Sequence, residues 1–193
     1  DNKPEIFAKI EEQQGMDNIE AITKHSDGLL VARGDLGIET DITNLPYVQR
    51  KMVRVALQAG KKCIVATQLL ESMITNPHPT RAEVSDVAQA IYDGVDAVML
   101  SAETAIGNHP EKVISTVDKI AIEIEKDALY FESLEASRTS SMQGVSNAIT
   151  VAAREVAETV KVKVICCFTH GGTTASLASR ERPRVPIIAL TPN

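Results

Sequence analysis

The chain has 193 residues, of which 44% are hydrophobic and 24% are charged. This length allows one globular domain or slightly more, and it is shorter than the ~250 residues that a complete eightfold β/α barrel takes. Aromatic residues make up only 3%, so the core has to be aliphatic, as it is in buried parallel strands covered by helices. The net charge of −6 provides no basic surface, so we expect neither nucleic acid nor a membrane as a partner.

The sequence gives no sign of membrane insertion or export. Its longest apolar runs, such as 97–100, are far shorter than the ~20 residues that span a bilayer, and its first residues do not resemble a signal peptide. Cys63, Cys166 and Cys167 lie in apolar, strand-like runs without the spacing of metal ligands, which indicates reduced, buried thiols. We therefore expect a cytoplasmic protein.

Short β-branched runs alternate with helical patterns along the chain, which predicts an α/β fold. The predicted strands are 6–10, 28–32, 63–66, 97–100, 162–168 and 186–190. The predicted helices before residue 140 are 16–25, 47–59, 80–92 and a long helix from 110 to about 135. Thr80 and Glu83 have the spacing of a capping box at the start of the third of these helices.

A change in composition marks a domain boundary. Residues 133–143 lose the apolar periodicity and gain serine and threonine, which is typical of a solvated linker. We expect one β/α segment at 1–135, a linker at 136–143, and a second segment at 144–193 that contains a helix, a strand, a glycine-rich turn, a helix and a strand.

Each of the first four predicted strands ends in a polar cluster. The clusters are Lys9-Ile10-Glu11, Arg33-Gly34-Asp35, Thr67-Gln68 and Ser101-Ala102-Glu103. The carboxyl ends of parallel strands converge on one rim, where β/α folds bind their ligands. One such cluster alone would more often be a solvated surface or a surface ion pair, but four at consecutive strand ends indicate a ligand site.

The residue types in these clusters suggest a metal and an anionic substrate. Glu11 and Asp35 supply two carboxylates, which suit Mg²⁺ or Mn²⁺. Lys9 points to the same side of its strand as Glu11, because residues two apart share a face. A metal and an ammonium facing one pocket would stabilise an enolate or a transferring phosphoryl group.

Five stretches resemble, in the same order, motifs of the pyruvate kinase family. They are Ala-Lys-Ile-Glu at 8–11, Val-Ala-Arg-Gly-Asp-Leu-Gly at 31–37, Ala-Thr-Gln-Leu-Leu-Glu-Ser-Met at 66–73, Pro-Thr-Arg-Ala-Glu-Val-Ser-Asp-Val-Ala at 79–88 and Asp-Ala-Val-Met-Leu-Ser-Ala-Glu-Thr-Ala at 96–105. Residues 182–191 resemble the C-terminal domain of that family. The resemblance implies the last four strands of a (β/α)8 TIM barrel at 1–135, followed after the linker by the start of a C-terminal α/β domain at 144–193.

The resemblance also implies an activity. It is the glycolytic transfer of the phosphoryl group of phosphoenolpyruvate to ADP, which gives pyruvate and ATP. The implied cofactors are Mg²⁺ (or Mn²⁺) and K⁺, and the K⁺ ligands would lie outside this chain. The family implies a homo-oligomer, commonly a tetramer, and half a barrel implies that the chain alone is inactive and, with two open sheet edges, self-associates.

The resemblance assigns roles to individual residues. Lys9 matches the lysine that stabilises the phosphoryl group and the enolate, and Thr67 matches the threonine that protonates the enolate. The metal ligands are matched by Glu11 and Asp35. The implied substrate-binding residues are Lys9, Ala32, Arg33, Gly34, Asp35 and Thr67, with the backbone amides of 32–34 holding the substrate carboxylate. We expect Ser101 and Glu103 only to support the site.

Three residues depart from the family pattern. Phe7 replaces a small aliphatic residue, Glu12 replaces an asparagine, and Ile106 replaces a lysine, which puts a nucleotide contact through that side chain in doubt.

Two other functions stay open at this point. One is another Mg²⁺-enolate barrel enzyme that uses phosphoenolpyruvate or pyruvate, and the other is a non-catalytic scaffold. The turn at 169–174 could bind an anion, but a tight turn permitted by its glycines is the favoured interpretation.

Overall fold

Four parallel strands form the central sheet of the first part of the chain. The structure, a computed structural model, describes residues 4–137 and 144–192. The strands lie in sequence order, as β1 (Phe7–Ile10), β2 (Gly28–Ala32), β3 (Lys62–Ala66) and β4 (Ala97–Met99). Register pairs Phe7 with Gly28 and Ile64 with Ala97. All four carboxyl ends therefore lie on the same side of the sheet, as the alternating pattern predicts.

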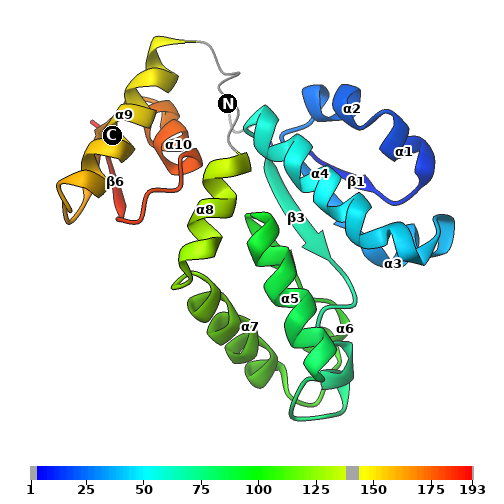
Figure 1. Ribbon diagram of the computed structural model, residues 1–193. Coiled ribbons are helices and arrows are strands. Elements are labelled where there is room, and N and C mark those ends of the chain that lie inside the picture. Colours follow the sequence, from blue (N-terminus) through cyan, green and yellow to red (C-terminus); the bar gives the residue numbers. More distant parts are fainter. Residues whose placement is uncertain (1–3, 138–143, 193) are drawn as a thin grey trace. The chain divides into compact units, whose positions relative to one another are not determined.

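Helical segments connect successive strands. In chain order they are α1 (Gln13–Asp17), α2 (Ile19–His25), α3 (Arg33–Glu39), the 3-10 helix η1 (Ile42–Asn44), α4 (Leu45–Ala59), the 3-10 helix η2 (Glu71–Ile74), α5 (Arg81–Asp93), α6 (Ala102–Ala105), α7 (Pro110–Ile124) and α8 (Ala128–Ser137). In Figure 1, α4 lies beside β3 and α5 lies beside α7. This succession of strand, helix and parallel strand is that of a partial β/α barrel.

Local sequence signals explain where helices α4 and α5 begin and end. Pro46 lies in the first turn of α4, where its missing N–H costs nothing, and Gly60 ends the helix with a left-handed φ of 65°. The predicted capping box is confirmed, because Thr80 and Glu83 exchange both of its hydrogen bonds at the start of α5. Gly94 ends α5 with a φ of 92°.

The core of this unit is aliphatic, as the composition predicts. Its fully buried large side chains include Leu29, Val31, Met52, Val65, Leu69 and Leu70. Phe7 is the exception among the strand residues, and the structure accounts for it. A Cβ built on its cross-strand partner Gly28 would lie 2.3 Å from Phe7 Cε1. The phenyl ring thus fills the space that Gly28 leaves, as aromatic residues do beside strand glycines.

Two predicted helices are each divided in the structure. The segment 16–25 forms α1 and α2, with Asn18 between them. The segment 110–135 forms α7 and α8, with a break at 125–127. There Asp127 accepts hydrogen bonds from the Tyr92 hydroxyl at 2.5 Å and from Leu129 N at 3.0 Å. These contacts start a new helix, and the first of them comes from α5, so the local pattern of α7 does not reveal it.

The second unit is a smaller α/β structure. The chain divides into Asp1–Arg138 and Thr139–Asn193, and the linker predicted at 136–143 falls outside the described residues except for 136 and 137, which end α8. The second unit contains α9 (Val145–Thr159), β5 (Ile165–Phe168), α10 (Thr173–Arg180) and β6 (Ile187–Leu190), with β5 and β6 parallel. In the turn before α10, Gly172 has a φ of 83°, which agrees with the tight-turn interpretation.

The cysteines differ in burial. Cys63 and Cys167 are buried, but Cys166 is exposed, so the prediction of a buried thiol is wrong for Cys166. The reason is the alternation of side chains along β5, which turns neighbouring residues to opposite faces.

Among the helices of the described residues, none is long and apolar enough to cross a membrane.

Candidate active site

Lys9, Glu11 and Asp35 meet at the carboxyl ends of β1 and β2. Lys9 Nζ lies 2.5 Å from Glu11 Oε2 and 3.1 Å from Asp35 Oδ2, and about half of each side chain is exposed. Hydrogen bonds to Glu11 and then to Asp35 raise the pKa of Lys9 above its ordinary value. The structure therefore brings together three residues that the sequence analysis singled out, and it keeps the ammonium charged.

The two carboxylates suit a divalent metal that also takes oxygens from substrate and water. Both Glu11 and Asp35 contact one cationic atom, Lys9 Nζ, so they already converge on a position for positive charge. Within residues 4–137 and 144–192, no group of three or more histidine, cysteine, aspartate or glutamate side chains could hold a metal. Mg²⁺ commonly uses one or two carboxylates and completes its shell with water and substrate phosphate, so these two ligands fit it.

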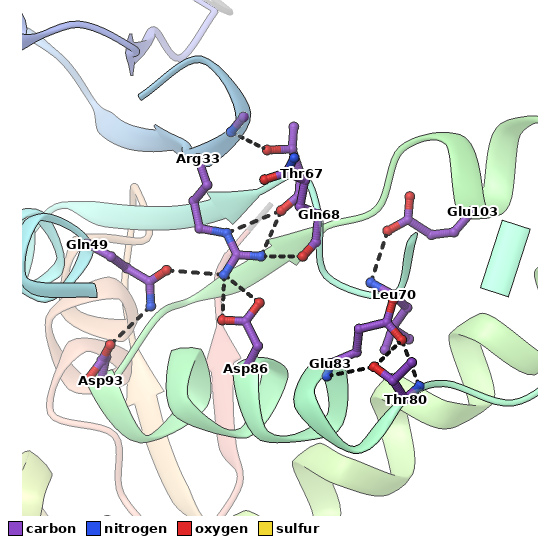
Figure 2. A network of polar contacts seen from close by, with 11 residues as sticks. Arg33, Gln49, Thr67, Gln68, Leu70, Thr80, Glu83, Asp86, Asp93 and Glu103 are labelled. Atoms are coloured by element: carbon purple, nitrogen blue, oxygen red, sulfur yellow. Dashed lines mark hydrogen bonds and ion pairs between the residues drawn. The ribbon is translucent and has the colours of Figure 1, made fainter. Parts of the chain in front are cut away.

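Arg33 starts α3 directly after β2, and its side chain points into the protein. Its guanidinium donates to Thr67 O at 2.7 Å, to Gln68 O at 2.8 Å and to Asp86 Oδ1 at 2.7 Å. Only 6% of the side chain is exposed. Figure 2 shows the guanidinium between the turn after β3 and Asp86 of α5. The Arg33 side chain is therefore engaged within the protein, so that only its backbone could meet a ligand.

Thr67 lies in the turn after β3 and faces the start of α3. Its Oγ1 accepts a hydrogen bond from Gly34 N at 2.9 Å. A Cβ on Gly34 would lie 3.4 Å from this oxygen, which is an ordinary van der Waals contact. The Gly34 N–H is thus already engaged by Thr67, and the proton of the Thr67 hydroxyl is the donor that this pair can offer an anionic group.

Glu103 follows β4 and is buried, with 2% of its surface exposed. It accepts hydrogen bonds from Ser101 N at 2.8 Å and from Leu70 N at 3.4 Å. Glu103 therefore connects the ends of β3 and β4 without facing solvent. This placement is compatible with the supporting role that we expect for Ser101 and Glu103.

The residues that hold the Arg33 guanidinium in place are not evident from the sequence. Asp86 accepts from its guanidinium, Gln49 Oε1 lies 3.5 Å from Nη1, and Gln49 Nε2 donates to Asp93 at 3.1 Å. Gln49 is on α4, and the two aspartates are on α5. Asp86 lies in one of the stretches that resemble the family, but its partner is 53 residues away. No local pattern in the sequence identifies that pairing.

Ile106 is the third residue that departs from the family pattern, and the structure places it at the surface. Ile106 ends α6 and is 78% exposed. It presents an apolar side chain where the family pattern has a lysine, so it provides no charge for a nucleotide phosphate.

Comparisons with known proteins agree along the whole chain. The family model described as the pyruvate kinase barrel domain matches residues 1–114, and that of the pyruvate kinase alpha/beta domain matches residues 147–193. A pyruvate kinase of Methylorubrum extorquens is 49% identical over 187 residues, which are 97% of this chain and 39% of the relative. A pyruvate kinase of Clostridium acetobutylicum is 43% identical over 189 residues, which are 98% of this chain and 40% of the relative.

The fold of this chain also matches that of a solved pyruvate kinase structure. A crystal structure of a pyruvate kinase from Cryptosporidium parvum matches with a TM-score of 0.90 and 39% identity, covering 98% of this chain and 39% of that chain. The chain thus spans about two fifths of the length of these relatives. Because the barrel-domain model alone covers more than half of the chain, the chain belongs to the pyruvate kinase family.

Proposed function

We propose that this chain provides one side of a site that transfers the phosphoryl group of phosphoenolpyruvate to ADP, giving pyruvate and ATP. The observation that carries the proposal is the contact of Lys9 with both Glu11 and Asp35, next to the paired Gly34 and Thr67. Phosphoryl transfer depends on positioning and charge neutralisation more than on covalent chemistry by the protein. An ammonium, two carboxylates and the Thr67 hydroxyl meet these needs.

Each of these residues has a distinct role in the proposal. Glu11 and Asp35 would hold Mg²⁺ or Mn²⁺, which supplies positive charge to the phosphate oxygens when bound. The Lys9 ammonium neutralises charge on the phosphoryl group as it leaves and on the enolate that remains. The backbone amides of Ala32, Arg33 and Gly34 hold the substrate carboxylate, and the Gly34 N–H exchanges its bond with Thr67 Oγ1 for one with the carboxylate.

Thr67 completes the reaction in this proposal. The enolate needs a proton on its third carbon, and the Thr67 hydroxyl passes one to it, directly or through a water molecule. The 2.9 Å hydrogen bond that Gly34 N donates to Thr67 Oγ1 supports this role, because it places the hydroxyl beside the strand end at which the substrate carboxylate would bind.

The site needs residues from beyond this chain in the function that we propose. The relatives are more than twice as long as this chain, so we expect the isolated chain to be inactive and the K⁺ ligands to lie outside it. A cytoplasmic location, K⁺ dependence and a homo-oligomer belong to the proposal. The two alternatives from the sequence, a different Mg²⁺-enolate enzyme and a scaffold, are not favoured by relatives that match nearly the whole chain.

Lys9→Met in the intact protein containing this segment tests the proposal. Removing one charge that stabilises the transition state should lower kcat about 10²–10³-fold. The measurement is pyruvate release from phosphoenolpyruvate and ADP with Mg²⁺ and K⁺, coupled to lactate dehydrogenase. Lys62→Met is the matched control, since Lys62 is a similarly exposed lysine that pairs with Glu5 at the opposite end of the sheet. Unchanged kcat in Lys9→Met would contradict the proposal.

A further inference from the structure

Two consecutive residues without glycine's freedom adopt left-handed backbone conformations directly after β3. Thr67 has a φ of 68° and Gln68 a φ of 54°. Side chains with a Cβ rarely adopt this conformation, and two in a row require an external constraint. The turn is followed by Leu69 and Leu70, both fully buried, so its ends are fixed while its middle is strained.

The Arg33 guanidinium provides a constraint on both residues. Nη2 donates to Thr67 O at 2.7 Å and to Gln68 O at 2.8 Å, and Nε donates to Thr67 O at 3.2 Å. The carbonyl groups of both left-handed residues are thus held by one planar group. Figure 2 shows these bonds converging on the guanidinium from the turn.

Asp86 fixes the opposite edge of the same guanidinium. Its carboxylate lies 2.6 Å from Nη1 through Oδ2 and 2.7 Å through Oδ1. Because Arg33 is itself buried, this pairing offsets the cost of burying its charge. The geometry needs a fork of donors in a plane, which lysine cannot supply.

We propose that Arg33 is a positioning residue, whose side chain holds the turn of Thr67 and Gln68 in the left-handed form that directs Thr67 Oγ1 to Gly34 N. Asp86 holds the guanidinium in place. The structural part of this inference stands on the contacts alone, whereas its effect on protonation of the enolate rests on the proposed function.

Arg50 of α4 offers a matched control, because its partner also lies on α5. It pairs with Asp93 of α5 at 3.0 Å, as Arg33 pairs with Asp86. Its side chain is 59% exposed, and its bond to Asp93 lies away from the turn of Thr67 and Gln68. Arg50→Lys therefore changes a comparable arginine without releasing Thr67.

The experiment compares Arg33→Lys with Arg50→Lys in the intact protein. Hydrogen exchange of peptides covering 66–73 reports the turn itself. Turnover of phosphoenolpyruvate gives kcat and KM, and exchange of the methyl hydrogens of pyruvate for solvent deuterium reports proton transfer alone. For Arg33→Lys we expect faster amide exchange at 66–73, a fall of at least tenfold in kcat and in methyl exchange, and a KM within threefold. For Arg50→Lys we expect all values within twofold of the parent.

A second substitution separates positioning from general damage. Glycine adopts the left-handed conformation without a steric penalty, so adding Gln68→Gly to Arg33→Lys should restore kcat at least threefold. If Arg33→Lys does not fold, Asp86→Asn replaces it, because it keeps the shape of the side chain and removes its charge. Equal effects of Arg33→Lys and Arg50→Lys, or an unchanged turn and unchanged kcat in Arg33→Lys or Asp86→Asn, would overturn the inference.

The readouts distinguish this inference from the proposed function. If the parent protein shows no phosphoryl transfer, the proposed function fails. The amide exchange at 66–73 then still decides whether Arg33 holds the turn, because it does not depend on activity.

Discussion

At the scale of single residues, the structure separates charged groups that can meet a ligand from those held inside the protein. The side chains of Lys9, Glu11 and Asp35 are about half exposed. Arg33 and Glu103 are buried and form hydrogen bonds with other groups of the protein. The sequence places all five at strand ends, because polar residues follow apolar runs there. It cannot tell which of them turn inward, since that depends on partners more than 30 residues away, such as Thr67 and Leu70.

Glu83 is a residue at which pH should affect stability. Burial acts to raise its pKa, but hydrogen bonds from Ser72 and Thr80 outweigh burial and lower the pKa below the ordinary 4.5. Its contribution is therefore present above pH 4.5 and is lost as the pH falls through the lower pKa of the folded state. Glu83→Gln turns an NH₂ group toward these donors and should reduce the free energy of unfolding at pH 7 by about 1–3 kcal/mol.

Urea unfolding at pH 7 and at pH 3 measures this effect. The gap in stability between Glu83→Gln and the parent should narrow at pH 3, because below pH 4.5 the carboxylate of the unfolded chain binds a proton that folding has to displace. Glu123→Gln is the control, because Glu123 is exposed and forms a surface ion pair with Lys126; it should change stability by less than about 0.5 kcal/mol. A gap that is as large at pH 3 as at pH 7 would contradict this account.

At the scale of elements, the sequence predicts the strands and the long helices because their signals are local. The capping box of α5 and the end of α4 at Gly60 are examples. It does not predict α3, because Gly34 and Gly37 interrupt any apolar periodicity in its seven residues. It also does not predict the division between α7 and α8, which depends on Tyr92 from another helix.

The pairing of β1 with β2 leads to a test at this scale. Gly28→Ala places a Cβ 2.3 Å from Phe7 Cε1 and 2.9 Å from Lys62 O, so strands or ring must shift. We expect a loss of about 1–3 kcal/mol in the free energy of unfolding, as in other overpacked sites. Thermal or urea unfolding measures it.

Gly37→Ala is the control for that substitution. Its Cβ would meet only Leu45 Cδ2 at 3.9 Å, an ordinary contact, and alanine favours the helix. Adding Phe7→Ala to Gly28→Ala should recover only part of the loss, since the backbone contact with Lys62 remains. If Gly28→Ala is as stable as Gly37→Ala, the ring does not fill this space tightly.

At the scale of the molecule, the described residues of the first unit form an open sheet whose outer strands each pair with one neighbour. The strand order β1-β2-β3-β4 leaves β1 and β4 at the edges. The family resemblance predicts this outcome, because four strands are half of the eight in a closed barrel. Composition and length alone exclude a complete barrel but do not determine which half is present.

We expect the isolated chain to self-associate through these edges, because unpaired strand edges are templates for pairing. Light scattering should show species larger than a monomer. Met99→Lys, on the edge strand β4, should reduce their size, since an edge lysine opposes pairing. Ile38→Lys, at an 82% exposed position on α3, is the control for apolar surface and should have little effect. A monomeric parent chain, or an equal effect of both substitutions, would argue against association through the edges.

The contact of Arg33 with Asp86 has a consequence for how this protein can be altered. The two positions are 53 residues apart in the sequence, yet a substitution at either one leaves the charge of the other without its partner. A library that randomises one of them alone should return only the parent residue. A library that randomises both should enrich complementary pairs, so that the two positions behave as one unit of selection.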